Sequence, residues 1–515
     1  MDSNADGIGD LRGIIQKLDY LGDGTESSLG IDGIWLSPFF RSPMRDFGYD
    51  ISDYRDVDPI FGTLDDFKEL LFEAHKRNIR VIIDLVLNHT SDQHPWFQES
   101  RRSREGPRAD WYLWHSGRNG RPPNNWFCQF ELKNAWWYEP QRGQYYLGTF
   151  TRHQPEVNWR NPGLRREMLD LVRFWLDMGV DGFRLDVVNW FVKDQELRSN
   201  PLSLRDIDLH RHIYDRNRPE TIDICRELRA LTDSYSDRMM VGEVYTDDPE
   251  ISAAYYGSGG DALHLVFYFD LLFQPWSAEK ISRSLGRWYS RLPGGAWPTF
   301  TLSNHDNVRH AARYSAGRWT GARARVAAAL LLTLRGTPFL YYGEELGMSG
   351  GKLRRRDLVD PLSRKTWPFK RFRRDLARTP MQWNGTPNAG FTRARPWLPV
   401  DPSFASVNVE AQAASGDSLL AFYKRLIRLR KEHPALAEGE IRFLPECLPA
   451  VLAYVREHES GKVLVALNFT GKRARAEVPA PFAKMKVLLG AGVSPADTVT
   501  MEPYEVLIAE EGAAE

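Results

Sequence analysis

The sequence contains very little cysteine and no excess of charge of either sign. Its three cysteines, Cys128, Cys225 and Cys447, lie far apart in 515 residues, which excludes a disulfide framework and is typical of free thiols in a reducing cytoplasm. Lys plus Arg and Asp plus Glu each number 68, so the formal net charge is zero. Because such a chain has no overall field to attract a polyanion or an anionic membrane, a neutral substrate is favoured.

Long hydrophobic runs are absent too. No stretch of about 18 apolar residues occurs, and the opening residues lack the basic and then apolar pattern of a secretion signal. We therefore expect no membrane span. Two basic clusters, residues 352–356 and 370–374, are interpreted as solvated loops or pocket arginines, since the chain is neutral overall, and a nucleic-acid partner is not expected.

Short apolar runs bounded by Gly, Pro or Asp do occur, and helical patterns separate them. Strands that are buried on both faces have continuous apolar sequences, and their alternation with helices predicts a parallel sheet. A parallel sheet of this size closes most readily into a (β/α) barrel, whose chemistry lies at the carboxyl ends of its strands. The predicted strands are residues 31–38, 80–88, 181–188, 238–245, 264–269, 297–304 and 337–342.

The segments between these strands divide the chain into domains. Residues 89–158 are rich in Trp, Asn, Pro and Gly and too long for an ordinary loop, which indicates a small domain inserted at the mouth of the barrel. An amphipathic helix over 418–436, stopped at Pro434, precedes a region of alternating apolar residues. The predicted domains are a catalytic barrel over 1–88 and 159–436, an inserted domain over 89–158, a small insertion over 190–220 and a C-terminal β-domain over 438–515.

Charged residues occur at the ends of several strands. Arg184 and Asp186 are two positions apart, so on a strand they point to the same face. A guanidinium beside a carboxylate lowers its pKa, which keeps a nucleophile in its attacking form. Asp84, in the middle of the 80–88 strand, is interpreted as a structural partner of Arg184. Taken alone, any one of these residues is better explained by an ion pair that holds the barrel together.

Other strands add a second acid and further polar side chains. Glu243 is a lone acid after an apolar run, and burial near another anion would keep such a group partly protonated. His89 and the pair His305-Asp306 follow two other runs. Two carboxylates with opposite protonation needs indicate glycoside cleavage, in which one attacks the anomeric carbon and the other protonates the leaving oxygen. Zinc-dependent hydrolysis fits less well, because no His and Cys cluster has zinc spacing.

Several segments resemble the signature segments of the α-amylase family of glycoside hydrolases. In chain order they are GIWLSP (33–38), DLVLNH (84–89), GFRLDVV (182–188), GEVY (242–245), SNHDN (303–307) and GTPFLYYGEELG (336–347). QPEVNW (154–159) and RTPMQW (378–383) are more similar still to the α-glucosidase and oligo-1,6-glucosidase branch. The resemblance covers almost the whole chain. It implies an α/β fold with a (β/α)8 TIM barrel, a domain inserted after the third strand and a C-terminal antiparallel β-sandwich.

The resemblance also implies roles for single residues. Asp186 matches the family's nucleophile, Glu243 its general acid/base and Asp306 its transition-state stabiliser. Three residues match those that bind the innermost sugar, His89, Arg184 and His305, and Tyr49 matches the aromatic that stacks on it. Asp46 and Arg374 match the pair that seals the pocket beyond the non-reducing glucose, and Arg378 matches an arginine that supports this pair.

The stretch DSNADGIGD, residues 2–10, has the alternating Asp and Asn oxygens of a loop for a hard cation. It is not an EF-hand, because Gly13 stands where that loop needs a bidentate Glu. A turn of Asp, Asn and Gly without a metal is the alternative. By resemblance the stretch matches the family's structural calcium or magnesium loop, and no organic cofactor is implied. The implied ligands are Asp2, Asn4, Asp6, the Ile8 carbonyl and Asp10.

The number of strands leads to one further expectation. The family's barrel has eight strands and its cation loop directly follows the first, whereas here seven strands are predicted and Met1 directly precedes the loop. We therefore expect the first strand to be absent and the barrel to be open between its second and eighth strands. Such a chain should express poorly, and an extension of roughly 15–25 upstream residues should restore its solubility.

These observations predict a retaining, exo-acting α-glucosidase that releases glucose from the non-reducing ends of short α-glucosides, with a small oligosaccharide as its partner. Val187 lies beside the nucleophile, and in the resembling family a Val there goes with α-1,6 activity, whereas Ala or Thr goes with α-1,4 preference. Oligo-1,6-glucosidase is therefore one alternative. A transglucosylase or trehalose synthase-like isomerase is another, and a catalytically dead ancillary relative, as in amino-acid transporters, is the non-enzyme alternative.

Overall fold

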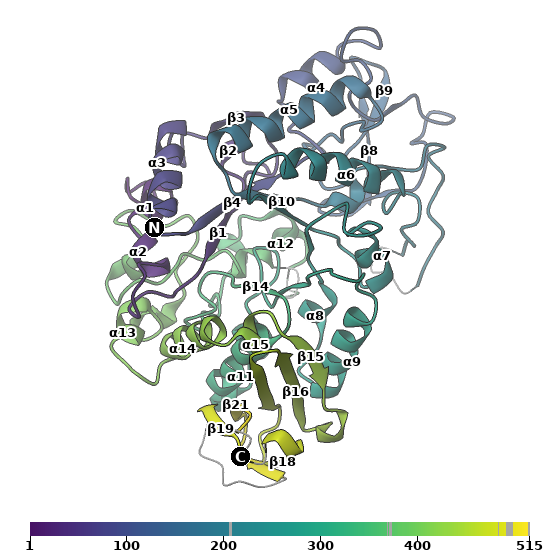
Figure 1. Cartoon of the computed structure of the whole chain (residues 1–515). Helices are drawn as coiled ribbons and strands as arrows, with labels where there is room; N and C mark the ends of the chain where they lie inside the picture. The colour runs from purple at the N-terminus through teal and green to yellow at the C-terminus, as the bar shows by residue number, and fades with distance from the viewer. Residues whose placement is uncertain (205–208, 368, 370–372, 483, 491–497, 513–515) are drawn as a thin grey trace.

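The computed structural model of the protein describes residues 1–204, 209–367, 369, 373–482, 484–490 and 498–512. Some residues of the regions named above lie outside these ranges: residues 205–208 of the small insertion, 368 of the catalytic barrel, 370–372 of the second basic cluster, and 483, 491–497 and 513–515 of the C-terminal domain. Within the described residues, an α/β core is followed by an antiparallel β-domain at the C-terminus (Figure 1).

All seven predicted strands are present, and they run parallel. Five of them form one sheet in the order β1-β4-β10-β11-β12, and β13 pairs with β14. A parallel bridge between Phe267 and Thr299 continues the ladder from β12 towards β13. The strands are β1 (Gly33–Leu36), β4 (Arg80–Leu85), β10 (Gly182–Leu185), β11 (Met239–Gly242), β12 (Leu265–Val266), β13 (Thr299–Thr301) and β14 (Thr337–Phe339).

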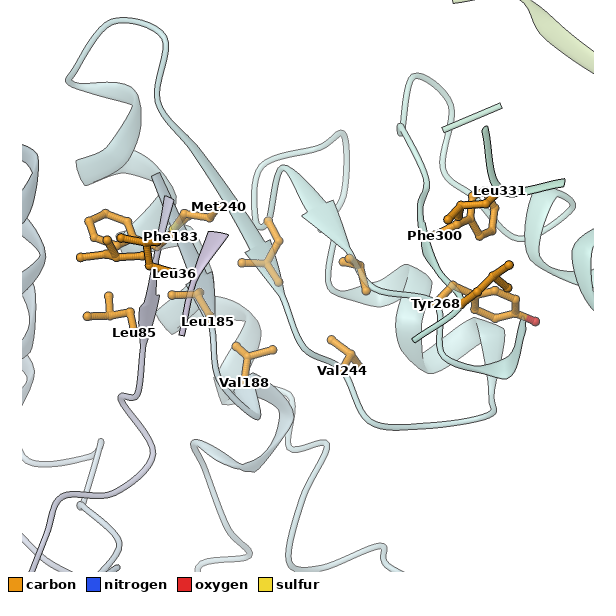
Figure 2. Close-up of a cluster of buried hydrophobic side chains, with 14 of the residues drawn as sticks. Leu36, Leu85, Phe183, Leu185, Val188, Met240, Val244, Tyr268, Phe300 and Leu331 are labelled. Atoms are coloured by element: carbon orange, nitrogen blue, oxygen red, sulfur yellow. The ribbon is translucent and has the colours of Figure 1, made fainter. Parts of the chain in front are cut away.

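The side chains of these strands divide between two apolar layers, as the two-residue period of a strand requires. On β4, Val81, Ile83 and Leu85 join the large core under the helices, whereas Ile82 joins a cluster inside the barrel. Figure 2 shows Leu85 with Phe183 of β10 in the outer layer. Burial on both faces explains why these strands have continuous apolar sequences. The inner cluster contains Ile82, Val241, Leu265, Phe267, Phe269 and Leu272, with Trp35, Met239, Trp297 and Phe339 against it.

Helices connect the strands and pack outside the sheet. At the start of α3, the Thr63 hydroxyl accepts from the Asp66 N–H at 3.2 Å and the Asp66 carboxylate accepts from the Thr63 N–H at 2.8 Å, which forms a capping box. The helices of this part of the chain are α1 (Leu11–Ile15), α2 (Leu18–Leu21), α3 (Leu64–His75), α5 (Pro162–Met178), α6 (Glu220–Asp233), α7 (Pro249–Ala254), α8 (Asp270–Phe273), α9 (Ala278–Tyr289), α10 (His310–Arg313), α11 (Thr320–Thr333), α12 (Pro361–Lys365) and α13 (Val409–Ala413).

Among the seven parallel strands that the structure describes, β1 and β14 each pair with one neighbour only, because the bridge between Phe267 and Thr299 links β12 to β13. Their burial reflects this, because β10 is buried throughout, whereas Gly33 is exposed and Thr337 to Phe339 are half-buried. Aromatic side chains span the space between the two edges, since the ring centroids of Trp35 on β1 and Phe339 on β14 lie 6.4 Å apart. The two outer strands are therefore less protected from water than the strands between them.

Residues 89–158 form small elements of their own between β4 and α5. Three short strands make an antiparallel sheet in the order β5-β9-β8, and β6 pairs with β7. A bridge between His89 and Glu156 joins the two ends of the segment. In Figure 1 this segment lies at the opposite end of the molecule from the C-terminal strands. Its elements are α4 (Pro95–Ser100), β5 (Trp114–His115), β6 (Phe127–Cys128), β7 (Lys133–Asn134), β8 (Trp136–Glu139) and β9 (Gln144–Leu147), and the antiparallel pair β2 (Phe40–Arg41) and β3 (Asp53–Val57) precedes it.

The C-terminal domain is an antiparallel sheet in the order β15-β16-β17-β21-β19, accompanied by a two-stranded ribbon of β18 and β20. Its side chains alternate, because Val451, Ala453 and Val455 of β16 pack with the ribbon, whereas Leu452 and Tyr454 pack with the core around α11. Its strands are β15 (Glu440–Phe443), β16 (Val451–His458), β17 (Gly461–Asn468), β18 (Ala474–Glu477), β19 (Lys486–Leu489), β20 (Thr498–Met501) and β21 (Val506–Glu510).

The helix predicted over residues 418–436 is in fact two helices. Ser418 caps α14 (Leu419–Glu432) by accepting from the Ala421 N–H at 3.0 Å. Pro434 does not merely stop this helix but begins α15 (Pro434–Ala437). Proline has no N–H to donate, and its fixed φ suits the first helical position, so it starts a new helix here.

Candidate active site

Three carboxylates share one buried guanidinium at the carboxyl ends of neighbouring strands. Arg184 Nη1 donates to Asp84 Oδ1 at 2.8 Å and to Asp186 Oδ1 at 2.6 Å. Its Nη2 donates to Glu243 Oε2 at 2.5 Å. The register of the sheet brings these groups together, since β10 pairs with both β4 and β11 and sets Arg184 opposite Asp84. The expected partnership between Asp84 and Arg184 is confirmed.

Two further arginines bind the acid that follows β13. Arg374 contacts Asp46 Oδ1 through Nη2 at 2.6 Å and Asp306 Oδ1 through Nη1 at 3.2 Å. Its Nε donates to Asp360 Oδ2 at 2.8 Å. Arg378 Nη2 donates to the same Asp306 oxygen at 2.8 Å. The two arginines thus join segments that lie far apart in the sequence into one wall of the site.

Neutral rings lie between the two charged groups. The Tyr49 hydroxyl donates to Asp84 Oδ2 at 2.8 Å and lies 2.9 Å from His305 Nε2, and the Tyr49 and His305 rings stack with centroids 5.3 Å apart. His89 Nε2 lies 3.1 Å from the Tyr49 carbonyl oxygen. Burial lowers the pKa of His89 and of His305 to about 3, so both rings are neutral hydrogen-bonding groups near neutral pH. These contacts bring all the predicted catalytic and substrate-binding residues into one connected cluster: Asp46, Tyr49, His89, Arg184, Asp186, Glu243, His305, Asp306, Arg374 and Arg378.

The expectation that the pKa of Asp186 lies below its ordinary value is wrong. Burial raises the pKa of Asp186 well above its ordinary value, and the Glu243 carboxylate adds to the rise, which Arg184 only partly offsets. Burial also raises the pKa of Glu243 and of Asp84. Because three carboxylates face one guanidinium, the group as a whole retains a proton at higher pH than isolated carboxyl groups would.

Asp306 has a different environment. Burial tends to raise its pKa, but the neighbouring His305 and the two arginines outweigh burial and hold the pKa of Asp306 well below its usual range. Its side chain is 34% exposed, whereas those of Asp186 and Glu243 are each 8% exposed. The site therefore contains one partly exposed carboxylate, Asp306, whose pKa is lowered, and a buried group of three carboxylates whose pKa values are raised.

Two members of the cluster were not predicted from the sequence. Asp360 is fully buried and holds Arg374, as described above. Gln154 Nε2 donates to Asp46 Oδ2 at 3.2 Å and lies 3.1 Å from His89 Nε2. Gln154 opens the segment QPEVNW, which carried part of the resemblance and could have pointed to it. Asp360 follows no strand, so no pattern marked it.

A buried ion pair between Lys193 and Glu156 ties residues 89–158 to the turn after β10. Lys193 Nζ also donates to Asn88 Oδ1 at 3.3 Å, and the Asn88 amide contacts His89 Nδ1 at 3.2 Å. His89 is thus held from both ring nitrogens, by the Asn88 amide at Nδ1 and by the Tyr49 carbonyl and the Gln154 amide around Nε2. Lys193 thus helps to orient a predicted sugar-binding residue.

The chain matches known proteins over most of its length. The sequence model of the alpha-amylase catalytic domain matches residues 1–439. The chain belongs to the alpha-amylase family. The resemblance inferred from the sequence is thus confirmed, and the protein is a glycoside hydrolase with the family's (β/α)8 barrel and a C-terminal sheet domain.

Individual relatives in the alpha-amylase family carry glucosidase and transferase names. The "Probable alpha-glucosidase" of Rhizobium meliloti (strain 1021) is 43% identical, over 93% of this chain and 88% of its own length. The oligo-1,6-glucosidase of Parageobacillus thermoglucosidasius is 39% identical, over 92% and 88%. Among solved structures, the alpha-glucosyl transfer enzyme XgtA has a TM-score of 0.94 and 42% identity, covering 99% of this chain and 97% of that one. The trehalulose synthase MutB from Pseudomonas mesoacidophila MX-45 has a TM-score of 0.90 and 32% identity, covering 99% and 96%.

In the described part of the chain, no helix has both the length and the apolar character needed to cross a bilayer. The three acids that match the family's catalytic residues, Asp186, Glu243 and Asp306, lie within the cluster. The site therefore offers no support for the catalytically dead alternative.

The stretch over residues 2–10 is a compact loop whose side chains bind its own backbone. The Asp2 carboxylate accepts from the N–H groups of Asn4, Ala5 and Gly7 and from the Thr392 hydroxyl, at 2.5 to 3.1 Å. These four bonds fill the positions that a carboxylate offers, so Asp2 does not fit a metal as it lies here. In the described residues, no three His, Cys, Asp or Glu side chains form a group that could hold a metal ion.

The other implied ligands in this loop keep acceptor positions. Asp6 accepts from the Ile8 N–H at 2.8 Å and from the Asn4 amide at 3.1 Å. Asp10 caps α1 by accepting from the Gly13 N–H at 2.6 Å and also accepts from the Ser3 N–H at 2.7 Å. Each carboxylate therefore has further lone pairs available. The implied set fits a cation in part, through Asn4, Asp6, Asp10 and the Ile8 carbonyl.

Glu344 lies next to Ser303 in the loop that carries Asp306, and its burial should make the stability of the protein depend on pH. Its carboxyl group is fully buried, accepts from the Ser303 hydroxyl and from the Tyr341 N–H, and has a pKa raised by burial to about 7. An unfolded Glu has a pKa of about 4.3, so the folded chain holds the extra proton between these values. The free energy of unfolding should therefore fall as pH rises from about 4.5 to 7.

Glu344→Gln should remove this part of the pH dependence. We expect the wild type to lose about 3 kcal/mol more stability than the variant between pH 4.5 and 8. Urea unfolding at the two pH values measures the difference, and Glu279→Gln, at a half-exposed side chain on α9, is the control. Identical pH dependence in the wild type and in Glu344→Gln would contradict the assignment.

Proposed function

We propose that the protein is a retaining α-glucosidase that releases glucose from the non-reducing ends of short α-glucosides. The observation that carries the proposal is that Asp186 and Glu243 bind neighbouring nitrogens of one guanidinium, that of Arg184. This arrangement favours the separation of about 5–5.5 Å used by retaining enzymes over the wider spacing of inverting ones. The names of the glucosidase relatives support the same reaction class.

In the proposed mechanism, Asp186 attacks the anomeric carbon while Glu243 gives its proton to the leaving oxygen. The shared proton of the buried group supplies that acid. Glu243, now ionised, takes a proton from water, which then hydrolyses the glucosyl ester on Asp186. Asp306 remains ionised throughout, and its charge stabilises the positive character of the transition state.

Attack at chain ends rather than within a polymer is supported by the wall around Arg374. The Arg374 guanidinium joins Asp46 and Asp306 and is itself buried, so this side of the site is closed by fixed charges. A closed wall beyond the last glucose admits a chain end and excludes a continuing polymer. Incubation with maltose, isomaltose, sucrose, trehalose and p-nitrophenyl α-glucoside tests the proposal, which requires glucose as the main product from at least one disaccharide.

Glucosyl transfer is the second candidate function. It is supported by the likeness to the alpha-glucosyl transfer enzyme XgtA, with its TM-score of 0.94, and by that to the trehalulose synthase. Transfer uses the same glucosyl ester on Asp186 and differs only in the acceptor, which is a sugar instead of water. Trehalose or longer oligosaccharides in quantity from maltose would favour this candidate over hydrolysis.

Linkage preference is proposed to depend on Val187. This residue adopts a left-handed conformation with φ of 38°, donates its N–H to Glu243 Oε2 at 3.2 Å and packs with Phe150 and Trp190. We expect the wild type to hydrolyse isomaltose and Val187→Thr to shift the isomaltose-to-maltose ratio of kcat/KM towards maltose. The shift should be about tenfold, since one methyl-sized change is worth about 1–3 kcal/mol. Val172→Thr, on the buried face of α5, controls for lost stability, and an unchanged ratio in Val187→Thr would reject the idea.

We also propose that the loop over residues 2–10 binds Ca²⁺ or Mg²⁺ in a structural role, as in the resembling family. Support comes from the acceptor positions left on Asn4, Asp6 and Asp10, and Asp2 would have to exchange one of its present hydrogen bonds to join them. Saturating CaCl2 or MgCl2 should raise Tm by about 2–4 °C over EDTA in the wild type and not in Asp6→Ala. Equal Tm values in the wild type would count against a metal.

Two finer expectations about the fold and the compartment remain proposals. We propose that, among the residues that the structure describes, no strand of the eight-stranded pattern lies between β14 and β1, which the one-sided pairing of both strands supports. A cytoplasmic location is supported by Cys128, Cys225 and Cys447, all of which are buried free thiols.

A further inference from the structure

A cavity of about 430 Å³ lies outside the cluster of site residues, between residues 356–359 and residues 388–404. Ligand-binding cavities commonly have volumes of about 300–1,000 Å³, so this one can hold a small molecule. None of its lining residues belongs to the active-site cluster described above. The residues that matter for its chemistry are Arg356, Val359, Asn388, Arg395, Trp397 and Phe404.

The cavity carries a surplus of positive charge. In the part of the chain that the structure describes, the exposed Arg395 forms no ion pair. Arg356 is 71% exposed, and its Nε lies 4.0 Å from Asp357 Oδ1. Asp357, the acid of the lining, is held more closely by Arg354, whose Nε donates to Oδ2 at 2.9 Å. The two lining guanidiniums therefore keep donors for an anion.

Aromatic rings and one amide make up other parts of the lining. Trp397 and Phe404 are half-buried, so each has part of its ring surface in the cavity. Such surfaces can pack against the apolar face of a sugar ring. The Asn388 amide donates to the Ala394 carbonyl at 2.7 Å and to the Thr392 carbonyl at 3.3 Å. Among the described residues nothing donates to Asn388 Oδ1, which can therefore accept from a hydroxyl group.

The cavity adjoins the wall of the active site from outside. The Trp397 ring centroid lies 5.7 Å from that of Phe47, and the Arg378 guanidinium lies 5.1 Å from the centroid of the same Phe47 ring. On the other side, the acid that holds Arg374 directly follows Val359. A molecule in the cavity would therefore contact the supports of both wall arginines without entering the catalytic cluster.

We propose that this cavity is a second binding site and that its ligand is a sugar phosphate. The guanidiniums of Arg356 and Arg395 would bind the phosphate, since arginine forms paired, charge-assisted hydrogen bonds with phosphate oxygens. The rings of Trp397 and Phe404 would contact the sugar. Phosphate is the chemistry that a sugar phosphate shares with the free ion, and the aromatic lining favours the sugar phosphate. The proposal goes beyond the glucosidase function and does not rest on it.

The test is calorimetric titration with glucose 6-phosphate, inorganic phosphate and glucose at an ionic strength of about 0.15 M. We expect glucose 6-phosphate to bind the wild type more tightly than inorganic phosphate. Arg356→Gln and Arg395→Gln should each raise its Kd by about tenfold, because each removes a charged hydrogen bond to the phosphate. Arg355→Gln and Arg393→Gln, at exposed arginines outside the lining, are the matched controls and should leave the Kd unchanged. A thermal melt checks that each variant folds.

Losses in both lining variants and in neither control support the site. Unchanged affinity in either lining variant, an equal loss in a control, or no binding of glucose 6-phosphate to the wild type overturns it. Inorganic phosphate that binds as tightly as glucose 6-phosphate shows that the rings hold nothing, and this overturns the sugar phosphate. A parallel loss of glucose affinity in the lining variants also overturns the proposal, because the effect would then pass through the wall of the active site. None of these outcomes depends on activity towards α-glucosides, so the proposed function is tested separately.

Discussion

Asp186→Asn should lower kcat on every α-glucoside by about three orders of magnitude or more while the fold survives. The amide cannot attack the anomeric carbon, so the covalent route is lost and only binding and positioning remain. Arg184 keeps its bonds to Asp84 and Glu243, which preserves the geometry of the group. Steady-state rates together with a thermal melt measure both parts of the expectation.

The raised pKa of Asp186 adds a stability expectation to the same variant. Because burial disfavours the ionised form, a neutral isostere at this position should leave Tm unchanged or raise it. Asp32→Asn, at an exposed carboxylate paired with Lys431, is the control for a general Asp to Asn effect. Retention of more than about a tenth of the wild-type activity in Asp186→Asn would overturn the assignment of the nucleophile.

Glu243→Gln should divide substrates by their leaving groups. Glu243 accepts from Arg184 and from the Val187 N–H, and the glutamine carbonyl can still accept from these donors. Without an acid, a disaccharide must expel an unprotonated alkoxide, so kcat/KM for maltose should fall by about 10²–10⁴. A nitrophenolate leaves without protonation, and p-nitrophenyl α-glucoside should lose far less in the first chemical step.

The decisive measurement for Glu243→Gln is the ratio of the two losses. A ratio of ten or more in favour of the aryl substrate identifies Glu243 as the acid. Equal losses would show that its part is structural, through Arg184.

Much of the fold could be predicted from the sequence because its signals are local. Five of the seven barrel strands, β4, β10, β11, β12 and β13, are largely buried on both faces, and such burial requires runs of apolar residues that are visible in the sequence. The pairing of Arg184 with Asp84 followed from strand geometry and from a simple charge argument. The inner layer around Ile82, in contrast, depends on register between strands and had no local signal.

The parts that could not be predicted depend on how many charges meet at one point. The sequence indicated that Asp84 and Asp186 lie beside Arg184, but not that Glu243 binds the same guanidinium. Burial together with these added negative charges raises the pKa of Asp186, opposite to the expected direction. Asp360 was missed for the same reason, because only the folded chain brings it to Arg374. The second helix at Pro434 was also not predicted, because a proline that ends one helix can equally begin the next, and the sequence pattern does not distinguish the two.

The contacts of Arg374 and Tyr49 have a consequence for folding. Arg374 meets Asp46 across 328 positions of chain, and Tyr49 meets His305 across 256. Loops of this length close late, because their ends are held together only after the intervening strands and helices have formed. Asp84, Arg184 and Glu243 can come together on adjacent strands well before that. A partly folded chain would thus hold the two reacting acids without the wall that selects a chain end, so recovery of activity during refolding should be the last event rather than an early one.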